Sequence, residues 1–254
     1  MLYRVLVLAT SLLLPAIIAV AQDPGAVHTY EAGSYIEAAQ QAELAGGADN
    51  LAFAARALLT DAIATNVQPS PERLADARRL AEAALALDEQ HIEGRIQLAI
   101  SLSLMARPMS AGAAMRSGLG QRARDIAKDV LLDDPDNPYA HAYLAIWNVE
   151  VIRRGGRIGG TVMGASIRRG REHYLAAIAS DPQDASIHWQ WARVLTALNA
   201  KKYRDEIDTA LAAARSQPTD TAIEGVMQDR ARTIEIALTT RSRAEVEGLA
   251  AEML

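Results

Sequence analysis

The chain has 254 residues, of which 50% are apolar and 22% are charged, and its formal net charge is −5. These proportions are typical of a globular protein with a sizeable core, and the acidic balance argues against a nucleic-acid partner. The absence of cysteine excludes disulfides, thiolate metal ligands and a lipid-modified cysteine. Only 4% of the residues are aromatic, so Ala, Leu, Ile and Val must build the core. Long Val/Ile/Thr alternations are absent, and the sequence therefore predicts an all-α fold with helix-on-helix packing.

The first 21 residues have the features of an export signal. Arg4 supplies a positive start, residues 5–18 form an apolar stretch, and Ala19-Val20-Ala21 is a small-x-small cleavage site. The apolar stretch is broken by polar residues and a proline, and it is shorter than the ~20 residues of a spanning helix. We therefore predict that residues 1–21 are a cleaved signal peptide, with an uncleaved anchor as the alternative. The mature chain is then expected to be periplasmic or secreted.

Helical segments recur along the rest of the chain at nearly constant spacing. Small residues at positions 55, 99, 145 and 192 each lie within an amphipathic run, at intervals of 44, 46 and 47 residues. A second run follows each one, with small or apolar residues spaced so that they share one helix face. The last three of these second runs end at Asp134-Pro135, Asp181-Pro182 and Gln217-Pro218, because proline cannot continue a helix.

This pattern resembles the tetratricopeptide-repeat (TPR) family. The matching features are the small residue of the first helix, the small pair of the second helix and the Asp-Pro turn, and they cover residues 48–218. The resemblance implies four pairs of antiparallel helices stacked into a right-handed solenoid, which usually serves protein–protein recognition. Residues 22–47 are then an N-terminal segment with a helix, and residues 219–254 form capping helices on the last repeat.

The repeats are longer than the family's usual length of about 34 residues. The excess falls between the two helices of each of the first three pairs, whereas the fourth pair is close to the family norm. The sequence thus predicts an enlarged inner turn in three repeats. Residues 107–124 and 153–171 are two of these turns, and equivalent turns of stacked repeats lie side by side. We expect the apolar centre of the second turn, residues 158–163, to pack on the first.

Charge is sorted between the two kinds of turn. Residues 94–124 and 151–171 contain arginines and no acid, whereas the turns between repeats are rich in aspartate. Helix-dipole effects explain the acids, but they do not explain arginines at the start of a helix, where positive charge is disfavoured. The sequence therefore predicts one basic edge that can bind an anionic partner, formed by Arg107, Arg116, Arg153, Arg154, Arg157, Arg168, Arg169 and Arg171.

The TPR resemblance also implies a concave groove lined by the first helices. The Lys/Asn set with which some family members hold a terminal carboxylate is missing, since Ala142 and Ile146 stand where polar groups are needed. The groove is therefore expected to receive an apolar ligand or side chain, with core packing as the alternative role for its aromatic residues. The groove positions carried over are Glu93, Ile96, Ile100, Tyr139, Ala142, Ile146, Ser186, Trp189 and Arg193.

No motif for catalysis, metal or cofactor stands out. The glycines of residues 155–160 follow no strand and precede no lysine, so they match neither phosphate-binding fingerprint. The five histidines show no metal-ligand spacing, although His141 and His188 occupy equivalent positions and can approach each other across a stack. A structural role for these two is the stronger interpretation. The sequence predicts a protein that is not an enzyme, with no metal and no cofactor.

Two functions remain open. The leading interpretation is an exported scaffold that binds a protein or peptide partner through its groove and basic edge. The alternative is a carrier of a small apolar or anionic ligand or lipid, which resembles the T-component proteins of tripartite periplasmic transporters in architecture alone. An anionic lipid surface is a further possible partner, and the oligomeric state is not predicted.

Overall fold

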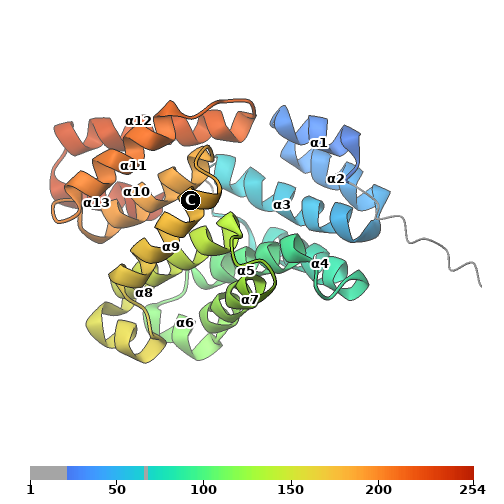
Figure 1. The fold of residues 1–254 in the computed structure, drawn as a ribbon, viewed down its shortest axis with the longest axis horizontal. Helices are drawn as coiled ribbons and strands as arrows, with labels where there is room; N and C mark the ends of the chain where they lie inside the picture. The colour runs from blue at the N-terminus through green and yellow to red at the C-terminus, as the bar shows by residue number, and fades with distance from the viewer. Residues whose placement is uncertain (1–21, 66–67) are drawn as a thin grey trace, which may run out of the picture.

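The computed structural model describes residues 22–65 and 68–254, and Figure 1 shows their arrangement. The expected signal peptide, residues 1–21, lies outside the described residues. The described part of the chain contains helices and no strand, so the all-α prediction is confirmed. The helices are α1 (Pro24–Glu31), α2 (Tyr35–Ala45), α3 (Gly47–Thr65), α4 (Pro71–Leu87), α5 (Ile92–Ala106), α6 (Ala111–Ser117), α7 (Leu119–Asp133), α8 (Pro138–Met163), α9 (Ile167–Ser180), α10 (Ala185–Asn199), α11 (Arg204–Ser216), α12 (Ala222–Thr240) and α13 (Arg243–Glu252).

Many of these helices begin at a residue whose side chain caps the free N–H groups of the first turn. The hydroxyls of Ser70, Ser110 and Ser166 accept hydrogen bonds from backbone N–H groups at the starts of α4, α6 and α9. Asp184 does the same at the start of α10, where its carboxylate accepts from the N–H of Ser186 at 2.7 Å. Local sequence therefore sets where the helices start.

Helices that are close in the chain pack side by side. The packed pairs are α3 with α4, α5 with α7, α8 with α9 and α10 with α11. Between pairs, α3 packs on α5 and α8 packs on α10, whereas α7 provides most of the contact between the second pair and α8. The small residues Ala55, Ala99, Ala145 and Ala192 are all at most 1% exposed, which lets the helix axes approach closely.

Two larger hydrophobic cores hold the molecule together. One lies among α1 to α5 and α7 around Phe53, and the other surrounds α10 and reaches α8, α9, α11, α12 and α13. In the second core Trp191 is fully buried and stacks on Tyr174 with 4.9 Å between the ring centroids. Gly170 permits the close packing of α9 on α8, because a Cβ there would lie 3.1 Å from the carbonyl oxygen of Ala145.

The predicted enlarged turn is wrong for the first pair, where α3 continues to Thr65 and α4 begins at Pro71. The second pair has an insertion, the short helix α6. In the third pair Gly156 interrupts α8, and a short helical stretch up to Met163 precedes α9, which begins at Ile167. The physical reason is that backbone N–H and C=O groups need partners, and longer helices satisfy them where long turns would leave them to water.

The last two helices do more than cover the fourth pair. Helix α12 packs on α10 and α11 and also touches α3, and α13 packs on α10 and α12. Residues 222–254 thus connect the end of the chain to the first pair, a contact that the sequence analysis did not foresee. In Figure 1 the end of the chain lies near the centre of the molecule, between α3 and the α8–α10 region.

Candidate functional site

Residues 250–254, the last turn of α13 and the two residues after it, are held by arginines from three distant parts of the chain. The Arg107 guanidinium, just after α5, donates through Nη2 to the carbonyl oxygens of Ala251, Glu252 and Met253 at 2.9, 3.1 and 2.7 Å. Because the Arg107 guanidinium donates to three successive carbonyl oxygens, it binds the backbone of this segment and not its side chains.

Two further arginines complete the contact. Arg230 of α12 donates to the carbonyl oxygen of Leu254 at 3.0 Å and also to the carbonyl oxygens of Ile63 and Ala64 at the end of α3. Arg193 of α10 lies 3.5 Å from the carbonyl oxygen of Ala250. We call Arg107, Arg193 and Arg230 the arginine cluster. It ties residues 250–254 to both ends of the helix array.

Apolar side chains of the same segment fill the space between the inner helices. Ala250, Met253 and Leu254 are 0%, 7% and 3% exposed. Ala250 and Met253 belong to the core around α10, and the predicted groove residues Ala142 and Ile146 pack against that core. Residues 250–254 and the predicted groove residues Ala142 and Ile146 thus contribute to one core around α10.

Glu150 of α8 supplies the negative charge beside the arginine cluster. Its carboxylate lies 2.7 Å from Arg153 and 3.6 Å from Arg193, whose side chain is only 5% exposed. Burial by itself raises the pKa of Glu150, but the attraction of Arg193 and Arg153 outweighs it and the net pKa shift is downward.

Burial and mutual repulsion act on the arginines themselves. Burial, together with the nearby charge of Arg193, lowers the pKa of Arg107 to about 10 and that of Arg230 to about 10. The pKa of Arg193 is also lowered, chiefly by burial. Positive charge in this region is thus costly, and the backbone carbonyls of residues 250–254 and the Glu150 carboxylate offset that cost.

The remaining predicted groove residues are divided between a polar rim and the core. Glu93, at the start of α5, pairs with Arg56 of α3 at 2.5 Å and accepts from Gln22, while Tyr139 is half exposed at the start of α8. Ser186 lies at the start of α10, where its N–H is capped by Asp184. Three others are partly or fully withdrawn from solvent: Ile96 (6% exposed), Ile100 (partly buried) and Trp189 (fully buried).

The two arginine-rich segments lie side by side, as the repeat register predicts. Arg154 donates to the carbonyl oxygens of Ala106 and Met109, and Arg124 donates to that of Met163 at 3.2 Å. The expected apolar packing between them is wrong, because Ile158 and Val162 are 80% and 65% exposed. The reason is that the backbone bends at Gly156 and the residues after it are helical, so one face of this short stretch is turned to solvent.

Most guanidiniums of the predicted basic edge have partners within the chain. Arg153 pairs with Glu150, Arg168 with Glu172 and Arg171 with Glu206, and Arg169 donates to the carbonyl oxygen of Gly164. Arg107 and Arg154 bind backbone carbonyls, as described above. Among the described residues of this edge, Arg116 and Arg157 are exposed and their guanidiniums form no ion pair or hydrogen bond. The chain itself neutralises much of the charge that the sequence analysis assigned to a partner.

The expected approach of His141 to His188 is also wrong. His141 faces His173 of α9 with 2.9 Å between their Nδ1 atoms, and His188 instead meets the hydroxyl of Tyr174. His141 Nε2 lies 2.9 Å from the carbonyl oxygen of Pro135 and must donate to it, so its Nδ1 accepts from His173. Both hydrogen bonds of His141 form when the His141 and His173 rings are neutral.

The His141–His173 pair predicts a loss of stability in mild acid. Burial, together with the neighbouring His141, lowers the pKa of His173 below its ordinary value of 6.5. As pH falls below 6.5, the unfolded chain therefore binds a proton before the folded chain does, and the free energy of unfolding decreases until the lowered pKa is passed. Urea unfolding on both sides of pH 6.5 should show this decrease in the wild type and a smaller one in His173→Gln. The exposed His28→Gln variant is the control, and an unchanged pH dependence in His173→Gln would contradict the assignment.

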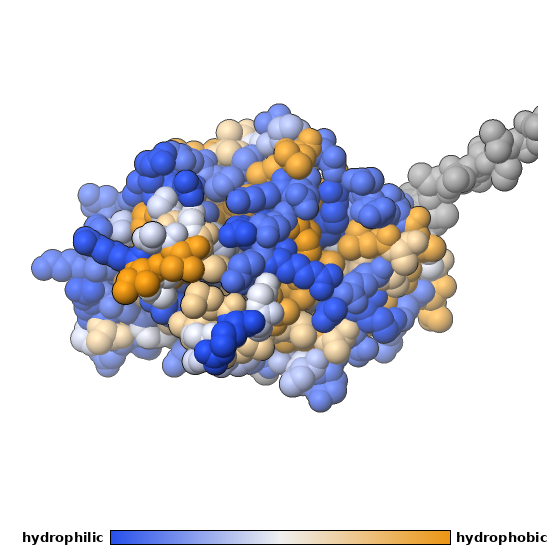
Figure 2. Space-filling view, turned by 90° about the horizontal axis from the view of Figure 1, so that it is seen from below, coloured by the Kyte–Doolittle hydropathy of each residue, from blue (hydrophilic) through white to orange (hydrophobic). Residues whose placement is uncertain are grey.

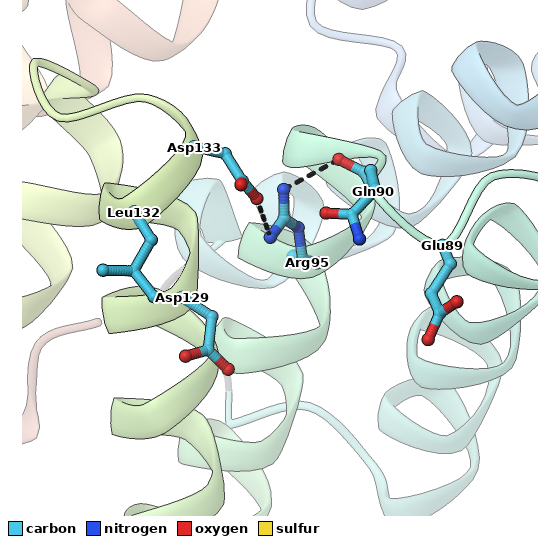
Figure 3. A pocket seen from close by; sticks show the side chains of 6 residues that line it. All are labelled: Glu89, Gln90, Arg95, Asp129, Leu132 and Asp133. Atoms are coloured by element: carbon cyan, nitrogen blue, oxygen red, sulfur yellow. Dashed lines mark hydrogen bonds and ion pairs between the residues drawn. The ribbon is translucent and has the colours of Figure 1, made fainter.

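A hollow of about 320 Å³ lies on the other edge, between the α4–α5 turn and α7 (Figure 3). Arg95 projects across it and joins Asp133 at 2.7 Å to the carbonyl oxygen of Gln90 at 2.8 Å. Glu89 and Asp129 also line it, and a second hollow of about 400 Å³ lies beside α2 and α4. Polar and charged side chains make up most of both linings.

The described residues contain no group of three or more His, Cys, Asp or Glu side chains that could hold a metal ion. In the same part of the chain no helix is both long and apolar enough to cross a bilayer. The most developed site is therefore the arginine cluster with residues 250–254. Compared with known proteins, the chain matches no protein-family model and no curated protein.

Proposed function

We propose that this protein is an exported, TPR-like helical-repeat module that binds the end of a helical segment of a partner protein between its inner helices. The solenoid of helix pairs, the periplasmic or secreted location and the absence of catalysis are parts of this proposal. The observation that carries it is that residues 250–254, the last turn of α13 and the two residues after it, already lie there, and that their backbone carbonyls accept hydrogen bonds from Arg107.

The contacts define what the groove recognises. Arg107 and Arg230 contact main-chain oxygens, which every peptide offers, whereas Met253 belongs to the core against which Ile63, Ala142 and Ile146 pack. We infer a peptide ligand with apolar side chains near the position of Met253. Residues 250–254 then occupy the groove within the same chain until a stronger segment displaces them.

Opening the groove by substitution tests this proposal. The Met253→Ser/Leu254→Ser variant keeps the full chain but loses the two apolar anchors of the segment, so a fluorescent peptide with the sequence of residues 243–254 should bind it and saturate. Wild type should bind the same peptide much more weakly, because its own segment competes. Fluorescence anisotropy measures both affinities, and a peptide of scrambled sequence is the control.

A second substitution decides whether Arg107 is the recognition residue. Adding Arg107→Gln to the opened variant removes three charge-assisted hydrogen bonds and should weaken peptide binding at least tenfold. Arg116→Gln, at an exposed arginine of α6 in the connection between α5 and α7, should leave the affinity unchanged. The proposed function is refuted if Met253→Ser/Leu254→Ser folds but does not bind the peptide of residues 243–254.

The alternative role as a carrier of a small apolar or anionic ligand is less well supported. The two hollows named above lie at the outer edges of the helix pairs, and charged and polar side chains make up most of their linings. Apolar cargo would need a lining of the opposite character. The peptide-binding role therefore accounts better for the groove.

A further inference from the structure

The far end of α8 exposes apolar side chains that no part of the described chain covers. We call residues 156–163 the α8 tip. Gly156 has φ 60° and ψ −157°, a backbone conformation that L side chains rarely adopt, and it breaks α8 so that the tip turns away from the preceding helix. Figure 1 shows the tip at the lower-left periphery of the molecule.

Gly160 fixes which face of the tip points outward. A Cβ on Gly160 would lie 2.3 Å from Ile152 Cδ1 and 3.1 Å from the carbonyl oxygen of Ala165, so this glycine face is pressed against the protein. Residues two positions before and after Gly160 lie on the opposite side of a helix with 3.6 residues per turn. Ile158 and Val162 therefore face solvent, in agreement with their exposures of 80% and 65%.

Unpaired positive charge accompanies this apolar face. Arg157 lies beside Ile158 in the tip, and Arg116 lies beside Met115, which is 46% exposed, at the end of α6. The guanidiniums of Arg116 and Arg157 are those of the predicted basic edge that have no partner within the described residues. Figure 2, which views this side of the molecule, shows an apolar run flanked by strongly hydrophilic side chains.

We propose that the α8 tip docks on an anionic lipid surface. Two exposed apolar side chains on one helix face, with the unpaired Arg157 beside Ile158, match the pattern by which amphipathic helices enter a bilayer interface without spanning it. The arginines select anionic headgroups, since each basic residue near such a surface adds to the attraction. No carboxylate lies within residues 151–171 to oppose that attraction. This inference is independent of the peptide groove and uses different residues.

Vesicle sedimentation tests the proposal with the full chain. Wild type should sediment with vesicles of mixed phosphatidylglycerol and phosphatidylcholine, more at low than at high salt, and only weakly with phosphatidylcholine alone. Arg116→Gln/Arg157→Gln should weaken binding to the anionic vesicles by roughly fivefold per arginine. Ile158→Ser/Val162→Ser should weaken it by roughly tenfold per side chain.

Leu132→Ser is the matched control, because Leu132 is also 80% exposed but lies beside Asp133 on the acidic edge. This variant should bind vesicles as the wild type does. The proposal is overturned if the wild type does not sediment with anionic vesicles, or if Ile158→Ser/Val162→Ser binds them as the wild type does. It is equally overturned if light scattering without lipid shows that the wild type self-associates and that Ile158→Ser/Val162→Ser abolishes this, since the tip would then be a protein contact.

Discussion

Glu150→Gln is expected to lower the free energy of unfolding by about 3 kcal/mol, the scale of breaking a buried ion pair by removing one partner. The substitution keeps the shape of the side chain but removes the negative charge that lies 3.6 Å from Arg193 and 2.7 Å from Arg153. Arg193, which is 5% exposed, then remains charged and buried with no carboxylate beside it. Arg107 is close enough for the same carboxylate to raise its pKa, so it is destabilised as well.

Chemical denaturation of Glu150→Gln and of a matched surface variant measures this effect. Glu206→Gln breaks the ion pair with Arg171, whose side chain is 41% exposed, and an exposed pair of this kind contributes at most about 1 kcal/mol. A loss no larger in Glu150→Gln than in Glu206→Gln would show that the carboxylate does not balance the arginine cluster.

Trp191→Ala is expected to destabilise the fold by about 4 kcal/mol, the range for truncating a buried tryptophan. Trp191 is 1% exposed in the core around α10, and it stacks on Tyr174 at an interplanar angle of 9°. The truncation loses this stacking and leaves a cavity between α9 and α10 that rigid helices cannot fill. For a chain of this size, the melting temperature should fall by about 10 °C.

Tyr139→Ala is the control for Trp191→Ala, because Tyr139 is an aromatic residue that is 50% exposed at the start of α8. Its truncation should cost about 1 kcal/mol or less, since half of its surface is already in water. Thermal unfolding followed by circular dichroism compares the two variants. Similar melting temperatures for both would mean that the core around α10 is not packed as described.

The losses of stability expected for Trp191→Ala and Glu150→Gln have different consequences for residues 250–254. Trp191 shares the core around α10 with Ala250 and Met253 and stacks on Tyr174 of α9, so Trp191→Ala should weaken the whole fold. Glu150 lies beside the arginine cluster that holds this segment, so Glu150→Gln should also make residues 250–254 easier to displace. Hydrogen exchange at the amides of this segment distinguishes local release from global unfolding.

Local features of the sequence predict where the helices lie and that helices close in the chain pack together. Side-chain caps such as Ser70 and Ser166, prolines at helix ends and small residues at 55, 99, 145 and 192 act within a few residues of where they stand. Such signals are readable from a single chain because helix formation and the apolar face of a helix depend on local spacing. The sequence also predicts that residues 107–124 and 153–171 lie side by side, because equivalent parts of stacked helix pairs are neighbours.

The partners of the arginines, and the position of residues 250–254, depend on contacts between segments that are far apart in the chain. Arg107 reaches carbonyl oxygens that follow it by 144 to 146 residues in the chain, and Arg230 reaches Ile63, 167 residues before it. Backbone carbonyls are the same at every residue, so no sequence pattern marks the ones that an arginine will bind. The outward face of Ile158 likewise depends on Gly160 resting against Ile152, a contact that appears only once α8 has folded past Gly156. Charge and hydropathy in the sequence show which side chains need partners, but chain folding over long distances determines which of them are satisfied within the molecule.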